Sequence, residues 1–343
     1  MTPPYNLKNI QALRWLAALL VFVQQAVYFS GQINNDSIQE FLRLSFASIG
    51  VFVFFIISGF VIALQTDKKP SLFAAHRLAR IYPAFFIAAI VASLIFFLFS
   101  NYRPVLNSGT LSMLLIPVGS LNGTFQIPYW TLIYEVFFYA LVLLAMIAFK
   151  ARPQLLNIAM FAWLLVILGF SNAGIKTSVA MPTLSEIVIS TLNIYFIVGF
   201  FLSRLLFSPT SRIAYAALFA MALEAVYFPE LRYTAIICTM GAIAILSLVR
   251  LPALPAFLIK LGDYSYGIYL MHMPVIFCLF LALKPHGVDL YTSIAIMTVI
   301  ALPAAILFGK LEYWFYQTKI RPAVDKILTR PNPLHQNQPL EQP

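Results

Sequence analysis

The chain has 343 residues, of which 61% are hydrophobic and only 10% are charged, and its formal net charge is +10. Soluble domains carry far more charge, so the composition excludes a soluble fold and predicts one polytopic, all-α membrane domain. The two cysteines, Cys238 and Cys278, lie in hydrophobic segments and are interpreted as core residues rather than as a disulfide.

Hydropathy predicts about ten membrane-spanning helices in one bundle. No cleavable signal peptide is expected, because no small-residue cleavage site and polar mature chain follow the first apolar stretch. The expected spans lie at roughly 15–31, 46–64, 81–99, 129–149, 154–171, 184–203, 212–228, 233–249, 263–283 and 291–312.

Basic residues gather on one side of these expected spans. If the N-terminus is cytoplasmic, the inner segments hold all of the 22 lysines and arginines except Arg43, Arg103, Lys176, Arg232 and Lys284. The positive charge therefore follows the positive-inside rule, which places both termini in the cytoplasm. It indicates contact with the lipid bilayer, and no nucleic-acid partner is expected.

The first span begins at Arg14 and contains two adjacent glutamines, Gln24 and Gln25. Eleven helical residues place Gln25 about 16 Å beyond Arg14, well inside the bilayer. Arg14 is interpreted either as an anchor whose charge reaches the lipid headgroups or as a site residue. The amides either link helices by hydrogen bonds or belong to a site.

The segment before the third span contains Arg77 and Arg80, three residues apart. If the helix starts before Arg77, both side chains share one face. Two guanidinium groups held together form a clamp for phosphate groups, since each offers a planar fork of donors. The alternative is a pair of anchors that touch lipid headgroups.

Two segments do not fit the pattern of spans. Residues 110–121 are apolar but too short to cross a bilayer, and Pro117 and Gly119 interrupt them, so a re-entrant or interfacial segment is expected. Residues 329–343 are rich in proline, glutamine and asparagine and are predicted to form a disordered tail.

Glu135 is the only charged residue of an apolar run that is long enough to cross a bilayer. A carboxylate inside a membrane helix is unfavourable by at least a few kcal/mol, so it indicates a functional site that faces the protein interior. Thr131, Glu135 and Tyr139 are spaced four apart and are expected to share one polar face. The acid suits general acid or base chemistry; the alternative is a buried ion pair that holds helices in register.

His272 is the only one of the four histidines within an expected span. A buried imidazole either transfers protons near neutral pH or satisfies a neighbouring helix carbonyl, and the sequence leaves both roles open. Asp263 is expected to cap a helix. Glu224 and Glu312 lie near span ends, where a charge is less unfavourable, and are not assigned to the site.

Taken in order, these segments resemble the acyltransferase 3 family of integral-membrane acyltransferases, in particular the branch that O-acetylates bacterial exopolysaccharides. The segments that carry the resemblance are Leu13–Gln25, Gly50–Ile62, Arg77–Pro83, Trp130–Tyr139 and Ser265–His272. The resemblance implies a ten-helix acyltransferase domain over residues 1–328, followed by a cytoplasmic tail, in a bacterial cytoplasmic (inner) membrane.

The resemblance also implies a reaction. An acyl group, most simply acetyl, would pass from acyl-CoA as co-substrate to a hydroxyl of a cell-surface carbohydrate or its lipid-linked precursor; no metal and no permanently bound cofactor is implied. The residues expected in the site are Glu135, Gln25 and His272 for catalysis, Arg77, Arg80 and Arg14 for binding CoA, and Trp130, Thr131, Tyr134, Tyr139 and Ser58 around the substrates.

One position departs from the family. The family's first helix ends in a histidine that takes part in transfer, and alignment from Leu13 places Gln25 there. Glutamine can form hydrogen bonds but cannot accept a proton at a useful pH. Either transfer is lost, leaving a non-catalytic membrane partner, or Glu135 or His272 supplies the base. A secondary transporter is a further class, although no matched pair of interrupted helices indicates inverted repeats.

Overall fold

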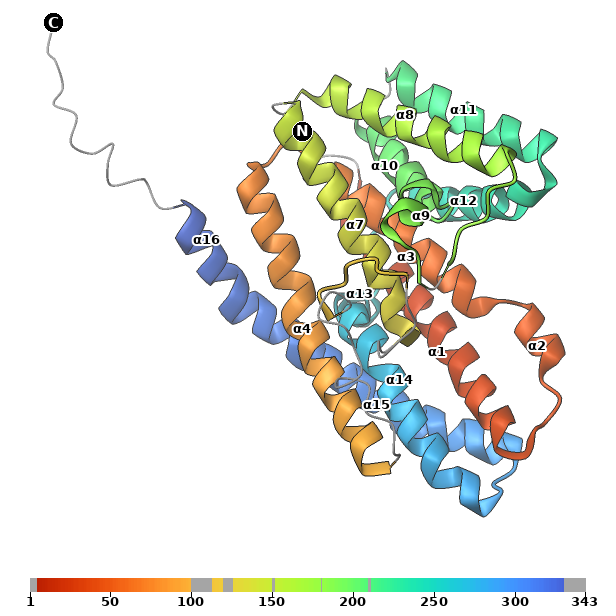
Figure 1. The fold of residues 1–343 in the computed structure, drawn as a ribbon. Coiled ribbons are helices and arrows are strands. Elements are labelled where there is room, and N and C mark those ends of the chain that lie inside the picture. Colours follow the sequence, from red (N-terminus) through yellow and green to blue (C-terminus); the bar gives the residue numbers. More distant parts are fainter. Residues whose placement is uncertain are drawn as a thin grey trace, which may run out of the picture.

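The computed structural model describes residues 5–99, 113–119, 126–149, 152–179, 181–208 and 211–329. Within these ranges the chain is a bundle of helices, and the only strand-like pairing is a single antiparallel bridge between Val118 and Thr183 (Figure 1). Eight helical segments are long and apolar enough to cross a membrane. The prediction of an all-α membrane protein is confirmed. Of the predicted tail, residues 329–343, Thr329 ends the last helix and residues 330–343 lie outside the described residues.

Each expected span overlaps at least one helix. These helices are α1 (Ile10–Asn34), α3 (Phe46–Ala63), α4 (Pro70–Phe99), α7 (Gln126–Ala148), α8 (Pro153–Asn172), α9 (Leu184–Ile189), α10 (Asn193–Phe207), α11 (Arg212–Tyr227), α12 (Pro229–Leu248), α14 (Ser265–Leu283) and α15 (Leu290–Phe315). Shorter elements are η1 (Leu7–Asn9), α2 (Gln39–Arg43), α13 (Ala256–Asp263), η2 (Lys284–His286), the π-helix η3 (Tyr316–Ile320) and α16 (Arg321–Thr329).

The span expected at 184–203 is divided between α9 and α10. Thr183 and Glu186 form a capping box that starts α9. Asn193 Nδ2 donates hydrogen bonds to the carbonyl oxygens of Ile187, at 2.6 Å, and Ser190, at 3.2 Å, across the break. The 15 residues of α10 are fewer than a full crossing requires, so the number of spans stays a prediction.

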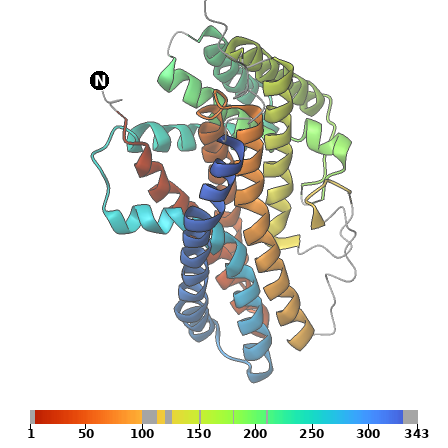
Figure 2. The same cartoon turned by 90° about the vertical axis from the view of Figure 1, so that its left-hand side faces the viewer.

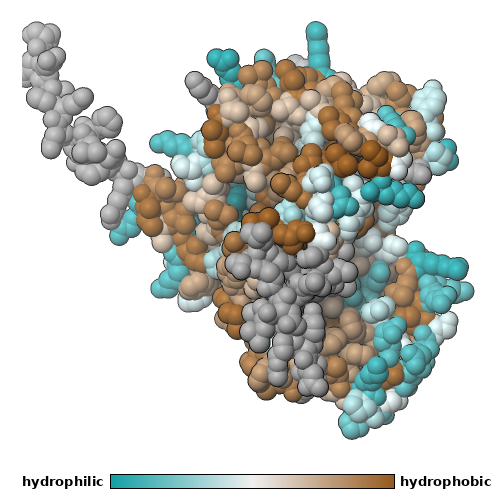
Figure 3. Space-filling view, viewed as in Figure 1, coloured by the Kyte–Doolittle hydropathy of each residue, from teal (hydrophilic) through white to brown (hydrophobic). Residues whose placement is uncertain are grey.

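The helices form two groups around α3 and α7. Figure 1 shows α8, α10, α11 and α12 gathered beside one end of α7, and α4, α14 and α15 on the other side. Apolar residues cover much of the face in Figure 3, while hydrophilic residues gather at its margins, as expected for a surface that meets lipid tails.

Two helices are longer than a bilayer requires. The 30 residues of α4 span about 45 Å, against about 30 Å for the hydrocarbon core. Figure 2 shows α15, η3 and α16 as one long helix beside α4, and it covers 39 residues up to Leu328. His76 Nε2 and Asp325 Oδ1 lie 2.9 Å apart where α16 packs on α4. Both helices are therefore longer than the hydrocarbon core is thick, and they are joined where α16 packs on α4.

Two glycines allow α3 and α10 to cross at very short distance. A Cβ on Gly59 would overlap the carbonyl oxygen of Phe196, and a Cβ on Gly199 would overlap that of Ile56. Small residues at such crossings let helix backbones approach within a membrane. The crossing fixes α3 in position, and with it Ser58, which precedes Gly59 and belongs to the site described below.

Asn9 fastens the N-terminal turn to the connection between α12 and α13. Its fully buried Nδ2 donates to the carbonyl oxygens of Leu248, Leu251 and Pro252 at 2.9–3.2 Å. Its Oδ1 accepts from the backbone N–H of Leu254 at 3.0 Å. The hydropathy pattern does not predict this role of Asn9, because its hydrogen-bond partners lie about 240 residues away in the sequence.

We expect Asn9→Ala to lower the free energy of unfolding by about 2 kcal/mol, because it leaves buried backbone groups without a partner. Thermal unfolding of the purified protein in detergent measures the effect. Asn6→Ala is the matched control, since the Asn6 side chain makes no hydrogen bond within the described residues. An equal loss of stability in both variants would contradict the role of Asn9.

Candidate functional site

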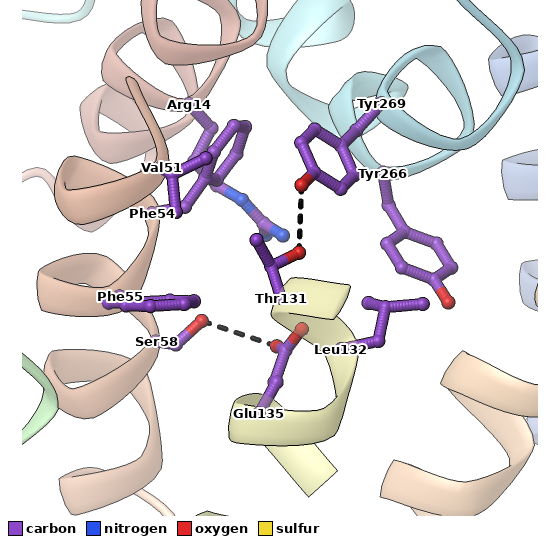
Figure 4. A pocket seen from close by; sticks show the side chains of 10 residues that line it. All are labelled: Arg14, Val51, Phe54, Phe55, Ser58, Thr131, Leu132, Glu135, Tyr266 and Tyr269. Carbon is purple, nitrogen blue, oxygen red and sulfur yellow. Dashed lines mark hydrogen bonds between the residues drawn. The ribbon is translucent and has the colours of Figure 1, made fainter. Parts of the chain in front are cut away.

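A small cavity that contains two charged side chains lies between α1, α3, α7 and α14, inside an otherwise apolar bundle (Figure 4). Its volume of about 40 Å³ holds a few water molecules. The residues that line it are Arg14, Val51, Phe54, Phe55, Ser58, Thr131, Leu132, Glu135, Tyr266 and Tyr269. Arg14 and Glu135 are its only charged side chains, so they determine its electrostatics.

The carboxylate of Glu135 is held by two hydroxyl groups. Ser58 Oγ donates to Glu135 Oε1 at 3.2 Å, and the phenol of Tyr139 donates to the same oxygen. Tyr139 lies one turn along α7, as the spacing of the polar residues predicts. The hydroxyl of Thr131, one turn in the other direction, lies 2.8 Å from that of Tyr269. Thr131 and Glu135 of the expected polar face therefore line the cavity, and Tyr139 is bonded to Glu135 behind it.

Arg14 points into the same cavity from α1, and its guanidinium lies above Thr131 in Figure 4. Its Nε is buried, and its side chain makes no hydrogen bond within the described residues. Arg14 and Glu135 do not form an ion pair, since the ion pairs among these residues are His76–Asp325 and Arg80–Glu312. The N–H donors of Arg14 thus face the Glu135 carboxylate across a small, mostly apolar cavity.

Arg77 connects the first turns of α4 to this cavity. Its guanidinium lies over the ring of Tyr139, 5.2 Å from the centroid, and Tyr139 in turn bonds Glu135. Lys68 and Arg321 carry further positive charge nearby. Partial burial, together with the charges of Arg77 and Arg321, lowers the pKa of Lys68. We call Lys68, Arg77 and Arg321 the basic cluster.

Arg80 has a different environment from Arg77. Its Nη1 forms an ion pair with Glu312 Oε1, and its guanidinium lies over the rings of Tyr266 and Tyr316, at 5.1 and 5.0 Å. Only 7% of the Glu312 side chain is exposed. Both arginines lie on α4 as expected, but they contact different partners, and Arg80 is paired with a carboxylate on α15. The only sequence signal for this pair was that Glu312, an acidic residue, lies near the end of the last expected span.

We expect Arg80→Met to reduce the free energy of unfolding by about 3 kcal/mol or more, because it leaves the Glu312 carboxylate buried without its cation. The double variant Arg80→Met/Glu312→Leu should recover most of that loss, since neither charge remains. Thermal unfolding in detergent compares the three proteins. A single variant as stable as the parent would show that the pair is not buried in the membrane-embedded protein.

The other residues proposed from the first and late spans lie outside the cavity lining. Gln24 Oε1 accepts from the backbone N–H of Ala47 at 2.7 Å, so this amide links α1 to the start of α3. The Gln25 side chain makes no hydrogen bond within the described residues and does not line the cavity. His272 is 1% exposed, and its Nδ1 lies 3.2 Å from the Ile268 carbonyl oxygen. Its Nε2 is buried without a partner in the described part of the chain.

Two aromatic residues of α7 also lie away from the cavity. The hydroxyl of Tyr134 donates to the carbonyl oxygen of Ser178 at 3.2 Å and accepts from Ser190 at 3.4 Å. Trp130 packs edge-on against Tyr134 at 6.1 Å. Tyr134 therefore attaches α7 to the segments on either side of α9, and neither residue lines the cavity.

The described part of the segment expected to be re-entrant, residues 113–119, lies beside the start of α9. Val118 pairs with Thr183, and the backbone N–H of Gly119 donates to the Pro182 carbonyl oxygen at 3.2 Å. These residues do not form a spanning helix.

The comparisons with known proteins agree with one another and together cover most of the chain. A family model described as an acyltransferase domain matches residues 7–310. The chain is 33% identical over 149 residues to the acyltransferase MdmB of Streptomyces mycarofaciens, covering 39% of this chain and 38% of that protein. It is 30% identical over 252 residues to the exopolysaccharide production protein ExoZ of Rhizobium meliloti (strain 1021), covering 67% of this chain and 77% of that protein. No solved structure matches the chain.

Proposed function

The chain belongs to the acyltransferase domain family, which matches it over residues 7–310, and we propose that it transfers an acyl group from acyl-CoA to a hydroxyl group. The acyl group is most simply acetyl. The acceptor is a carbohydrate or its lipid-linked precursor, a choice that the name of the relative ExoZ supports. The protein works as a multi-pass protein of a bacterial cytoplasmic membrane.

The observation that carries this proposal is the arrangement of Arg14 and Glu135, which face one cavity without pairing. The acceptor hydroxyl gives its proton to the Glu135 carboxylate while its oxygen attacks the thioester carbonyl carbon. A C–O bond forms, and the negative carbonyl oxygen is stabilised by the donors of Arg14. The C–S bond then breaks, and the proton on Glu135 passes to the departing CoA thiolate.

Glu135 is the base in this scheme because of its place and its hydrogen bonds. Ser58 and Tyr139 both donate to Oε1, which fixes the orientation of the carboxylate toward the cavity. His272 and Gln25 do not line the cavity. Glu135 therefore acts as the proton acceptor. Gln25 stands where the family has a histidine and cannot take that role.

The basic cluster supports a binding site for the phosphates of CoA. Lys68, Arg77 and Arg321 bring three positive charges together near the contact between α4 and α16. Arg77 reaches from there to Tyr139, and so to the reacting group. In this proposal Arg77 belongs to the donor site, while Arg80 holds α15 through Glu312.

The test of the proposed function is acetyl transfer from labelled acetyl-CoA in membranes that contain the full chain. We expect Arg77→Ala to raise the KM for acetyl-CoA about tenfold, because a phosphate contact of about 1.4 kcal/mol is lost. Arg250→Ala is the control, since Arg250 is exposed and bonds its own helix at Leu246. An unchanged KM in Arg77→Ala would contradict the donor site.

The transporter and the non-catalytic partner give different results in the same membranes. A transporter would carry labelled saccharide into proteoliposomes without acetylating it. A non-catalytic partner would bind neither acetyl-CoA nor saccharide productively, and Gln25→His would be needed to start transfer. Transfer by the parent protein excludes both.

A further inference from the structure

A second cavity lies between α4 and α15 and has a very different character from the first. Its volume is about 370 Å³, within the range of small-molecule sites, and its walls are mostly apolar side chains. Pro83 and Ile87 contribute from α4, and Phe308, Leu311, Trp314 and Phe315 contribute from α15. We call it the α4–α15 groove.

The groove opens toward the lipid. Ile87, Leu311, Trp314 and Phe315 all line it, and each is 45–56% exposed. They belong to two helices that are long and apolar enough to cross the bilayer. Exposed apolar side chains at this depth meet hydrocarbon chains, so a chain from the bilayer can enter sideways without leaving an apolar environment.

One end of the groove is polar. Arg80 and Glu312 both line it. Glu312 Oε1 pairs with Arg80, whereas Oε2 is buried and has no hydrogen-bond partner within the described residues. A buried carboxylate oxygen without a donor is strongly unfavourable, so this end suits a ligand that brings a hydrogen-bond donor. A hydroxyl group is the donor that a saccharide supplies.

The polar end also lies next to the Glu135 cavity. The Arg80 guanidinium covers the ring of Tyr266 at 5.1 Å, and Tyr266 is itself part of the wall of that cavity. Tyr266 is held in place by its hydroxyl, which donates to the carbonyl oxygen of Ile81 at 2.9 Å. One aromatic side chain therefore separates the end of the groove from the cavity that contains Arg14 and Glu135.

We propose that the α4–α15 groove binds a lipid-linked saccharide acceptor, with its hydrocarbon chain between the two helices and a saccharide hydroxyl donating to Glu312 Oε2. This inference rests on the proposed function and narrows it: the acceptor arrives from the bilayer rather than from water. The apolar walls bind the chain, and the buried acid distinguishes a hydroxylated head from a bare hydrocarbon. The head then lies beside Tyr266, at the edge of the reacting cavity.

The test uses the full chain in phosphatidylcholine nanodiscs and a dodecyl glucoside with a photoreactive diazirine in its chain. After irradiation, mass spectrometry locates the labelled residues. We expect labelling on α4 and α15 within the groove, and a decrease of about tenfold when Ile87→Trp or Leu311→Trp fills it. Ile90→Trp is the matched control, because Ile90 is on α4 and 66% exposed but does not line the groove.

Two labelling results would overturn the proposal. Equal labelling in Ile87→Trp, Leu311→Trp and Ile90→Trp would show that the groove is not occupied by the probe. Equal labelling by the same chain ending in a methyl ether, which has no hydrogen-bond donor, would show an ordinary lipid site. We expect the glucoside to label more strongly than the ether, and the double variant Arg80→Met/Glu312→Leu, which removes the acceptor without leaving a lone charge, to abolish that preference.

Transfer measurements separate this inference from the proposed function. We expect dodecyl glucoside to be acetylated at about one tenth of the concentration that methyl glucoside requires, and Ile87→Trp to abolish the advantage. Transfer to both acceptors at equal concentrations would overturn the groove and leave the acyltransferase intact. Specific labelling of the groove without transfer to any acceptor would overturn the acyltransferase and leave the groove as a lipid-linked saccharide site.

Discussion

Glu135→Gln should lower kcat for acetyl transfer by about 10²–10⁴-fold, the range that a positioned general base contributes. Glutamine has nearly the same shape and can still accept hydrogen bonds from Ser58 and Tyr139 through its amide oxygen. The substitution therefore removes the ability to take a proton while the cavity keeps its form. The KM for acetyl-CoA should not change, because the basic cluster is untouched.

The measurement is initial-rate kinetics with labelled acetyl-CoA at saturating acceptor. Glu224→Gln is the control, since Glu224 on α11 accepts a hydrogen bond from Asn172 at 2.9 Å and is remote in sequence from every residue of the site. Activity that survives in Glu135→Gln would refute the role of this acid. In that case Gln25→His would become the informative variant, because it restores the family's proton acceptor.

Gly199→Leu should prevent the protein from folding. A Cβ at position 199 would overlap the carbonyl oxygen of Ile56, and backbone atoms cannot move aside as a flexible side chain can. The helices α3 and α10 would have to separate, and Ser58 would leave Glu135. We expect no monodisperse protein after detergent extraction, measured by size-exclusion chromatography with a fluorescent tag.

Gly169→Leu provides the control for this experiment. Gly169 lies on α8, and a Cβ there would meet no atom within 4 Å. We expect Gly169→Leu to fold normally. A defect confined to Gly199→Leu would then come from packing at that position and not from the loss of a glycine. Normal recovery of Gly199→Leu would show that α3 and α10 do not cross closely in the membrane.

The sequence predicts the helices well and brings Tyr139 to Glu135 on one helix face, because both depend on local chemistry. Hydropathy locates the spans, since an apolar run of sufficient length has few alternatives in a bilayer. Glu135 is identified by the free-energy penalty of burying its charge, and the spacing of four residues correctly brings Tyr139 to it.

The remaining features depend on partners that are distant in the sequence. Arg80 and Glu312 are 232 residues apart, so no local pattern reveals that the second arginine is paired. Tyr134 lies within the same motif as Glu135, yet its hydroxyl is directed to Ser178. The run at 184–203 contains Glu186, which caps the start of α9, but the break after Ile189 depends on the side-chain amide of Asn193, which hydropathy does not reveal.

The extra length of α4 and of the α15–α16 helix has a consequence for how the proposed donor is chosen. In the proposed arrangement the basic cluster is reached from water at the end of the bundle where α16 packs on α4, whereas the cavity with Glu135 lies between the helices. The nucleotide of acyl-CoA would then be bound first, in water. Its acyl chain would be bound afterwards, in the interior of the protein. Affinity for the donor would depend chiefly on the nucleotide, and discrimination between short and long acyl chains would depend on the small volume around Arg14 and Glu135.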